Sequence, residues 1–316
     1  MCGSEMMLHA INKHLQSKGH TIKVLVKGSH RFKLMNHMVY DDIDLFGADE
    51  SNEMNLFRTA DLVITHLDYA SWTQEMASIF KIPCVQLIHN DYDRPHLRDS
   101  HKPQYVVYNS KWIKDKLGYP QESFILIPPT DFRHYDTNTN INLREHITLI
   151  NLDQNKGGHI LGKIAEAMPD KKFIGVIGSY SEPAKIGQHT HQPPNVEVLG
   201  SQQDIRKVYE RTKILIMPSK YESWGRTATE AMCSGIPVIC TPTSGLVENC
   251  GNAGIFVRDR DDIDQWVKEI TKLFNEKAYS KASEKAKIRS RELDPRKNLD
   301  DFEQWLGKAK ASYSYR

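Results

Sequence analysis

The chain of 316 residues contains little cysteine, and its five cysteines follow no recognisable pattern. Cys2, Cys84, Cys233, Cys240 and Cys250 are odd in number and lack the paired spacing of a zinc site or a disulfide framework. Free thiols are typical of a reducing cytosol, so we predict a cytoplasmic location. Long apolar runs are missing as well. No stretch is long enough to cross a bilayer, and the N-terminus lacks the pattern of a signal peptide.

A strong charge of one sign is also absent. The formal net charge is +2, which gives no reason to expect nucleic acid as the main partner. No Gly-x-Gly-x-x-Gly motif follows an apolar run, which argues against a dinucleotide cofactor. With 39% hydrophobic and 26% charged residues, the composition is that of a globular protein, and the length suits two domains.

In the first part of the chain, short apolar runs alternate with helical patterns. Helical patterns cover Ser4–Lys18 and Tyr69–Phe80. The expected strands are Thr21–Val26, Ala60–His66, Pro83–His89, Gln104–Ser110 and Ser123–Pro129. Because these runs are rich in Val, Ile and Leu, we predict a parallel sheet covered by helices on both faces.

A second alternation follows the polar, asparagine-rich segment Asp136–Glu145, which indicates an interdomain linker. Its expected strands are His146–Leu152, Lys171–Gly178, Asn195–Gly200, Lys213–Ser219, Ile236–Thr241 and Ala253–Val257. We therefore predict an α/β protein of two facing doubly wound domains, residues 1–140 and 141–316, with a ligand in the cleft between them. Charged helical segments from about Asp261 to Lys310 close the chain and are candidates to pack back on the first domain.

Within the second domain, the stretch ESWGRTATE holds two carboxylates, Glu222 and Glu230, eight positions apart. Pro218 ends the preceding strand, and a loop follows as far as Gly225. A helix is expected to begin near Arg226 or Thr227 and to run to about residue 234, where Gly235 caps it.

This arrangement suits a nucleotide sugar. The free N–H groups and the dipole at a helix start favour an anion such as a diphosphate, and Gly225 lets it approach the backbone. Glu230, about one turn into the helix, can accept hydrogen bonds from a ribose diol, while Glu222 lies on the sugar side of the phosphates. Taken alone, Glu230 is as well explained as a residue that caps the helix and interacts with its dipole.

The whole string is more specific, and it resembles the signature of the glycosyl transferases group 1 family, retaining enzymes of GT-B fold. The matching positions are Pro218, Ser219, Glu222, Glu230, Ala231, Gly235, Pro237 and Val238. The resemblance implies that Glu230 binds the ribose of the donor. It also implies that Glu222, with the backbone amides of Ser223, Trp224 and Gly225, holds the donor sugar, and that Arg226 and Thr227 lie at the phosphate-facing helix start.

The likeness extends over most of the chain. Ile127–Tyr135 and Val106–Leu117 resemble the family segments that lead into the linker. The resemblance assigns Lys156, in a Lys-Gly turn, to the diphosphate and His89 to the donor sugar or reaction centre. A histidine at a strand end is otherwise more often structural than catalytic.

Two positions depart from the family pattern. Asn151 stands where the family usually has an arginine near the diphosphate. The start of the chain resembles the end of the family's glycine-rich loop, with Gly3 as a donor-binding candidate, so the first central strand is expected to be missing. Arg226 is a candidate to replace the arginine, although it can instead point to solvent.

Other signals compete with this interpretation. Asp91 and Asp93 form an Asp-x-Asp after a strand, which is how the other large glycosyltransferase fold holds a divalent metal. Such patterns are common in solvated loops, and we expect no obligatory metal. The basic and aromatic segments Lys27–His37 and Arg94–Gln104 are either solvated surface or an acceptor site for an anion, such as a lipid phosphate, a polyol-phosphate polymer or nucleic acid. The sequence also leaves open that the protein contacts a membrane surface peripherally.

The sequence therefore predicts a retaining, metal-independent glycosyltransferase. It would move a hexose-type sugar from a nucleoside diphosphate, expected to be UDP, to a hydroxyl acceptor that the sequence does not identify. No cofactor beyond the donor is expected. A sugar-nucleotide epimerase of the same fold and a catalytically silent nucleotide-sugar-binding protein are the alternatives.

Overall fold

The computed structural model describes residues 3–26, 37–92, 105–178 and 193–313. These residues form two compact units. One unit spans Thr130–Pro295, and the other combines Gly3–Pro129 with the C-terminal segment that begins at Arg296. The division falls ahead of the predicted boundary at residue 140, because the short helix α5 (Phe132–Tyr135) packs on helix α9 of the later unit.

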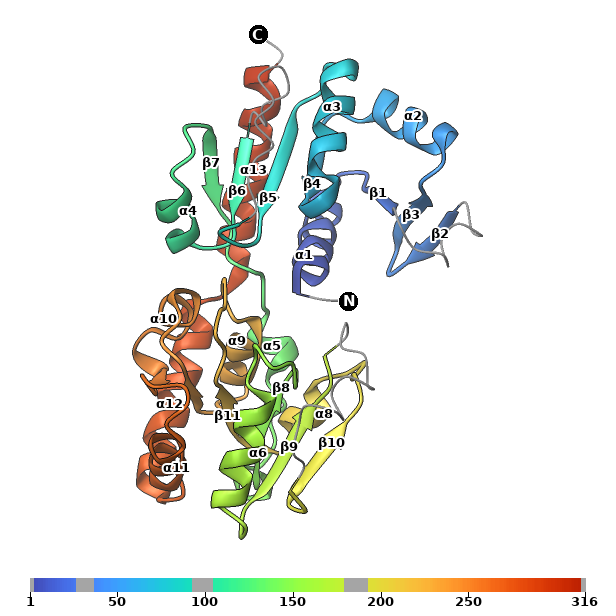
Figure 1. The fold of residues 1–316 in the computed structure, drawn as a ribbon. Coiled ribbons are helices and arrows are strands. Elements are labelled where there is room, and N and C mark those ends of the chain that lie inside the picture. Colours follow the sequence, from blue (N-terminus) through green and yellow to red (C-terminus); the bar gives the residue numbers. More distant parts are fainter. Residues whose placement is uncertain (1–2, 27–36, 93–104, 179–192, 314–316) are drawn as a thin grey trace. The chain divides into compact units, whose positions relative to one another are not determined.

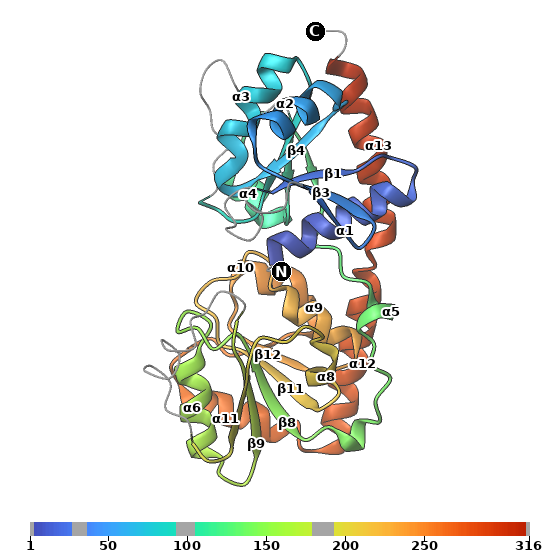
Figure 2. The ribbon, with the colours of Figure 1, turned by 90° about the vertical axis from the view of Figure 1, so that its right-hand side faces the viewer.

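The unit of residues 130–295 is built on one parallel sheet of six strands in the order β10-β9-β8-β11-β12-β13. The strands are β8 (His146–Ile150), β9 (Lys172–Val176), β10 (Val196–Leu199), β11 (Thr212–Met217), β12 (Val238–Cys240) and β13 (Ile255–Phe256). The longer helices are α6 (Gly158–Ala167), α9 (Arg226–Cys233), α11 (Ile263–Lys272) and α12 (Glu276–Glu292), with α8 (Arg206–Tyr209) and α10 (Ser244–Cys250) as short ones. Figure 2 shows α6 and α11 on one side of the sheet and α9 and α12 on the other, as expected of a doubly wound domain.

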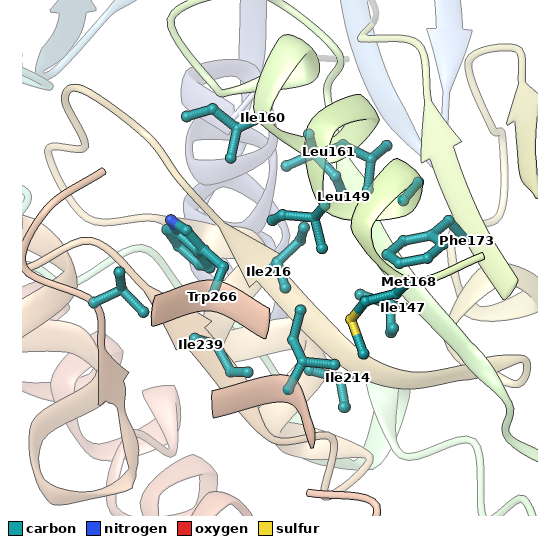
Figure 3. Packing of buried hydrophobic residues seen from close by; sticks show 14 of the residues in the cluster. Ile147, Leu149, Ile160, Leu161, Met168, Phe173, Ile214, Ile216, Ile239 and Trp266 are labelled. Carbon is teal, nitrogen blue, oxygen red and sulfur yellow. The ribbon is translucent and has the colours of Figure 1, made fainter. Parts of the chain in front are cut away.

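The core of this unit lies between the sheet and helices α6 and α11. Figure 3 shows Trp266 in one cluster with the isoleucines of the central strands, with Ile160 and Leu161 above them. Trp266 is fully buried, and its indole N–H donates to the carbonyl of Arg260 at 2.9 Å. Because apolar burial on this side holds the central strands together, the loops at their carboxyl ends have a rigid support.

The other unit contains a parallel sheet in the order β4-β5-β6-β7. Its strands are β4 (Val63–His66), β5 (Cys84–Ile88), β6 (Tyr105–Tyr108) and β7 (Glu122–Ile125). Its helices are α1 (Gly3–Ser17), α2 (Glu50–Thr59), α3 (Ala70–Phe80), α4 (Lys111–Leu117) and the C-terminal α13 (Pro295–Tyr313). Helices α1 and α13 lie together in Figure 2 and share one buried cluster with β5 and β6, so the last helix belongs to this unit.

Three further strands of this unit form a separate sheet in the order β1-β3-β2 (Figure 1). They are β1 (Lys23–Val26), β2 (His37–Tyr40) and β3 (Ile43–Gly47), and the last two were not expected from the sequence. Among the described residues, β1 is bonded only to β3 and β4 only to β5. A pocket of about 750 Å³ is lined by both of these strands, with α1, α2 and α13 around it. The expectation that the first central strand is missing stays a prediction.

Candidate functional site

The loop between β11 and α9, residues Pro218–Gly225, is called the donor loop below. The helix after it begins at Arg226 and ends at Cys233, and Gly235 follows with φ +66°, so the helix and its glycine stop are confirmed. Gly225 is the residue before the helix and has φ +82°. A Cβ on Gly225 would lie 2.5 Å from Cδ2 of Leu246, so both conformation and space require glycine.

Glu222 in the donor loop is paired with Lys156. The ammonium Nζ of Lys156 donates to Oε1 of Glu222 at 2.6 Å, and the hydroxyl of Ser219 donates to the same oxygen at 2.9 Å. The Lys156 side chain is 32% exposed and that of Glu222 is 12% exposed. The structure thus brings together two predicted donor-binding residues that lie far apart in the sequence.

The Lys-Gly turn is packed against the donor loop. Gly157 has φ +98°, and a Cβ there would lie 2.4 Å from Cγ of Pro218. The N–H of Lys220 donates to the carbonyl of Asn155 at 2.8 Å. Arg260 ties the two segments together, because its Nε donates to the carbonyl of Pro218 at 2.5 Å and its Nη2 to that of Gln154 at 2.7 Å.

Glu230 is 4% exposed and is held by two side chains. Nε of Arg226 donates to Oε1 of Glu230 at 2.7 Å, and the hydroxyl of Tyr209 donates to Oε2 at 2.9 Å. Burial, followed by the charge of Glu230, raises the pKa of Tyr209 well above its usual value, so this hydroxyl stays protonated. Each carboxylate oxygen can accept more than one hydrogen bond, so these two bonds do not exhaust the acceptor capacity of Glu230.

Arg226 lies inside this cluster. Its side chain is 13% exposed, and its Nη2 donates to the hydroxyl of Tyr135 at 3.1 Å. Burial raises the pKa of Tyr135 to about 12. The Nη1 of Arg226 is buried and finds no hydrogen-bond partner among the described residues. Arg226 therefore does not point to solvent, and two of its three nitrogens are used to hold Glu230 and Tyr135.

The remaining predicted residues of this unit lie as follows. Trp224 is 3% exposed, and its indole Nε1 has no hydrogen-bond partner among the described residues. The Thr227 hydroxyl lies 3.6 Å from the sulfur of Met217. The backbone of Ser223 lies against Gly245 at the start of α10. Asn151 has φ +73°, and its side-chain oxygen accepts from the N–H of Asp153 at 3.1 Å, which fixes the turn before Lys156.

His89 and Gly3 belong to the other unit. Gly3 is exposed and is the first residue of α1. His89 follows β5, and its Nε2 lies 3.0 Å from Nδ1 of His66 at the end of β4. The amide of Asn109 donates to the His89 carbonyl at 2.8 Å. Burial, and then the neighbouring His66, lowers the pKa of His89 to about 3, and burial also lowers the pKa of His66. Both rings are therefore neutral near pH 7.

Acidification should destabilise the fold through this histidine pair. In the unfolded chain a histidine binds a proton with a pKa of about 6.5, but folded His89 does so only near about 3. Between these values the unfolded chain binds more protons, so the free energy of unfolding falls as the pH falls. Denaturant unfolding at pH 7 and pH 5 should show the loss, and His89→Gln should reduce it. An identical loss in His89→Gln would contradict this origin.

The rival metal hypothesis is only partly covered by the structure. Asp91 forms an ion pair with Lys116, while Asp93 lies outside the described residues. Residues 27–36 and 94–104 of the two basic segments also lie outside them. Within the described ranges, no group of three or more His, Cys, Asp or Glu side chains could hold a metal ion. None of the helices in those ranges is long and apolar enough to span a membrane.

Residues 149–292 match the family described as Glycosyl transferases group 1. The match covers a little under half of the chain. It contains the Lys-Gly turn, the donor loop and both paired carboxylates, so the resemblance predicted from the signature is confirmed.

The other comparisons agree with this assignment. The O-antigen chain mannosyltransferase B of Escherichia coli is 37% identical over 62 residues, which cover 20% of this chain and 16% of that relative. The sucrose-phosphate synthase of Thermosynechococcus elongatus superposes with a TM-score of 0.76 at 15% identity, covering 98% of this chain and 94% of that one. Anabaena HepE in complex with UDP-glucose gives 0.76 at 16% identity and 96% coverage of both chains. The predicted α/β fold of the GT-B glycosyltransferases is thereby confirmed.

Proposed function

We propose that this protein is a retaining glycosyltransferase that moves a hexose-type sugar from a UDP-sugar to a hydroxyl acceptor. The observation that carries the proposal is the pairing of Lys156 with Glu222 beside helix α9, which is preceded by Gly225. Both residues lie within the segment that matches the glycosyl transferases group 1 family. A cation and helix-start amides are the groups that a diphosphate requires. The match to the HepE complex with UDP-glucose supports a nucleotide-sugar donor.

We assign the parts of the donor to particular residues. Glu230 accepts from the ribose hydroxyls through the acceptor sites that Arg226 and Tyr209 leave open. Lys156 and the amides at the start of α9 bind the diphosphate. Glu222 and the backbone of Ser223–Gly225 hold the sugar. His89, which is neutral at pH 7, acts as a hydrogen-bonding group for the donor sugar or the reaction centre rather than as a charged acid.

The proposed chemistry needs no nucleophile from the enzyme. The acceptor hydroxyl attacks the anomeric carbon on the face from which the diphosphate leaves, and the departing phosphate oxygen takes the hydroxyl proton. Negative charge grows on the distal phosphate as the bond to the sugar breaks, so positive groups fixed beside it lower the barrier. We propose that Lys156 supplies most of this stabilisation and that no divalent metal is required. A cytoplasmic location completes the proposal.

A panel of nucleotide sugars tests this function. The purified chain is incubated with UDP-, GDP- and ADP-linked hexoses, and release of free nucleoside diphosphate is followed. Slow hydrolysis of one donor, with retained anomeric configuration in any transfer product, supports a retaining transferase. An isomerised donor without hydrolysis would identify an epimerase, and binding without turnover would identify a silent binding protein.

Lys156→Ala should lower turnover of the preferred donor by at least about tenfold, which corresponds to roughly 1.4 kcal/mol of barrier. Lys163→Ala is the matched control, because Lys163 is an exposed lysine on the next helix, α6. Initial rates of diphosphate release are measured for both, with and without EDTA. Near-wild-type turnover in Lys156→Ala, together with complete loss of wild-type activity in EDTA, would overturn the mechanism and favour a metal at Asp91 and Asp93.

A further inference from the structure

Helix α10 packs directly against the donor loop. Gly245, in its first turn, is so close to the loop that a Cβ there would lie 2.3 Å from the carbonyl oxygen of Glu222. Asn249 lies four residues later and therefore on the same face of the helix. Together with Leu246, which packs against Gly225, these two residues contact the loop.

Asn249 is completely buried and anchors two carbonyls of the loop. Its side-chain Nδ2 donates to the carbonyls of Trp224 and Gly225, both at 3.0 Å. The hydroxyl of Thr229 on α9 donates to Oδ1 of Asn249 at 2.9 Å. Because Oδ1 is occupied by a donor, the NH₂ group has to face the two carbonyls, and both of its hydrogens are used.

When the orientation of a backbone carbonyl is fixed, the orientation of the following N–H is fixed as well. In a trans peptide the C=O and the following N–H lie in one plane and point in opposite directions. When the Trp224 carbonyl points toward Asn249, the N–H of Gly225 points away from it. The Gly225 carbonyl, which also accepts from the N–H of Ala228 at 2.9 Å, sets the N–H of Arg226 in the same way. These two amides open helix α9, where the first N–H groups have no carbonyl of their own helix to bond.

We propose that Asn249 is a positioning residue for the diphosphate: by anchoring the Trp224 and Gly225 carbonyls, it directs the Gly225 and Arg226 amides at the phosphate oxygens. The inference rests on the proposed function. It adds that the amides must be oriented by a residue that does not contact the donor, whereas Lys156 and Glu230 are proposed to contact it. Asn249 touches no part of the ligand and acts only through the loop. Its loss should therefore weaken binding of the diphosphate while leaving the interactions of the nucleoside intact.

Asn249→Asp tests this with almost no change in shape. A carboxylate can still accept from Thr229, but it cannot donate to the two carbonyls, and its charge repels them. Affinity for UDP and for uridine is measured separately by calorimetry or competition. We expect the UDP dissociation constant to rise at least about tenfold, as for loss of buried hydrogen bonds, and the uridine dissociation constant to change less than about twofold.

Asn195→Asp is the matched control, because Asn195 also donates through Nδ2 to three carbonyls, those of Ala165, Met168 and Lys171. It should lower thermal stability without changing the ratio of the UDP and uridine affinities. Should Asn249→Asp not fold, Thr229→Val removes the hydroxyl that orients the Asn249 amide. It should give a smaller loss that is again confined to UDP.

Three results would overturn the inference. UDP affinity in folded Asn249→Asp could equal that of the wild type, or UDP and uridine could weaken by the same factor, or Asn195→Asp could show the same selective loss. A wild-type chain that binds no nucleoside diphosphate from the donor panel would instead refute the proposed function, and the inference with it. The wild-type measurement therefore separates the two failures.

Discussion

Replacing Glu230 with alanine should raise the dissociation constant of the donor more than tenfold. Each hydrogen bond to a charged acceptor is worth about 1.5–3 kcal/mol, and the ribose would lose up to two of them. The same change leaves Arg226 without its carboxylate partner. Removing one member of a buried ion pair costs about 3–5 kcal/mol, and we expect the lower end because Arg226 keeps the Tyr135 hydroxyl.

Glu230→Gln separates the two effects. Glutamine keeps the volume and one acceptor oxygen, so the folded state should lose less stability than in Glu230→Ala. Binding of both UDP and uridine should still weaken, because the ribose is common to both. The free energy of unfolding and both affinities are measured for the two variants. A folded Glu230→Gln or Glu230→Ala with unchanged nucleotide affinity would show that Glu230 is only a structural residue.

Much of the donor loop could be predicted from the sequence because its determinants are local. The apolar run of β11, Pro218, and the glycines at 225 and 235 fix where the strand ends and where α9 begins and ends. The pairing of Arg226 with Glu230 was missed, although positions i and i+4 of a helix carry that signal. Arg226 was instead placed at the phosphate-facing helix start, as a candidate to replace the missing arginine, or toward solvent.

The contacts that complete the site could not be predicted in this way, because they join residues distant in the sequence. Tyr209 reaches Glu230 from α8, Arg260 reaches Pro218 from beyond β13, and Asn249 reaches Trp224 from α10. A single sequence shows each of these as an ordinary polar residue near a helix end. Only the folded parallel sheet, which places the carboxyl ends of β8, β11 and β12 side by side, brings them to the donor loop and helix α9.

The strands of the other unit show a different limit. β4, β5, β6 and β7 were predicted from continuous apolar runs, and their bounds agree within a few residues. β2 and β3 are short, and β3 contains an acidic residue, Asp44. Their partly exposed side chains give no strong period of two, so the hairpin is fixed by its pairing with β1 rather than by its own pattern.

The donor loop is thus shaped by side chains that bind its carbonyls. Arg260 holds the carbonyl of Pro218, Thr241 holds that of Ser219 at 2.6 Å, and Asn249 holds those of Trp224 and Gly225. Each anchored carbonyl turns the next amide of the chain the other way. A site built on amides needs this kind of support, because the loop itself has no regular ladder of hydrogen bonds to keep its peptide planes in place.

Gly245→Ala should damage this support directly. In a helix, alanine is normally better than glycine by about 0.5–1 kcal/mol. Here the new Cβ would lie 2.3 Å from the Glu222 carbonyl oxygen and 2.5 Å from the carbonyl carbon of Ser223. Both are backbone atoms, which cannot rotate away, so the loop or α10 has to move. Overpacking of this kind costs about 1–3 kcal/mol, which outweighs the gain in helix propensity.

The expected result of Gly245→Ala is lower stability and turnover reduced more than tenfold, because a shift of about 1 Å at a reacting group can cost about 100-fold. Gly307→Ala in α13 is the matched control. A Cβ at Gly307 would meet nothing within 4 Å, so this change should keep activity and raise stability slightly. Thermal unfolding and donor turnover are measured for both. If Gly245→Ala were as stable and as active as Gly307→Ala, the contact between α10 and the donor loop would not control the site. The amides of Gly225 and Arg226 would then be held without α10, through bonds such as that from the Ala228 N–H of α9 to the Gly225 carbonyl.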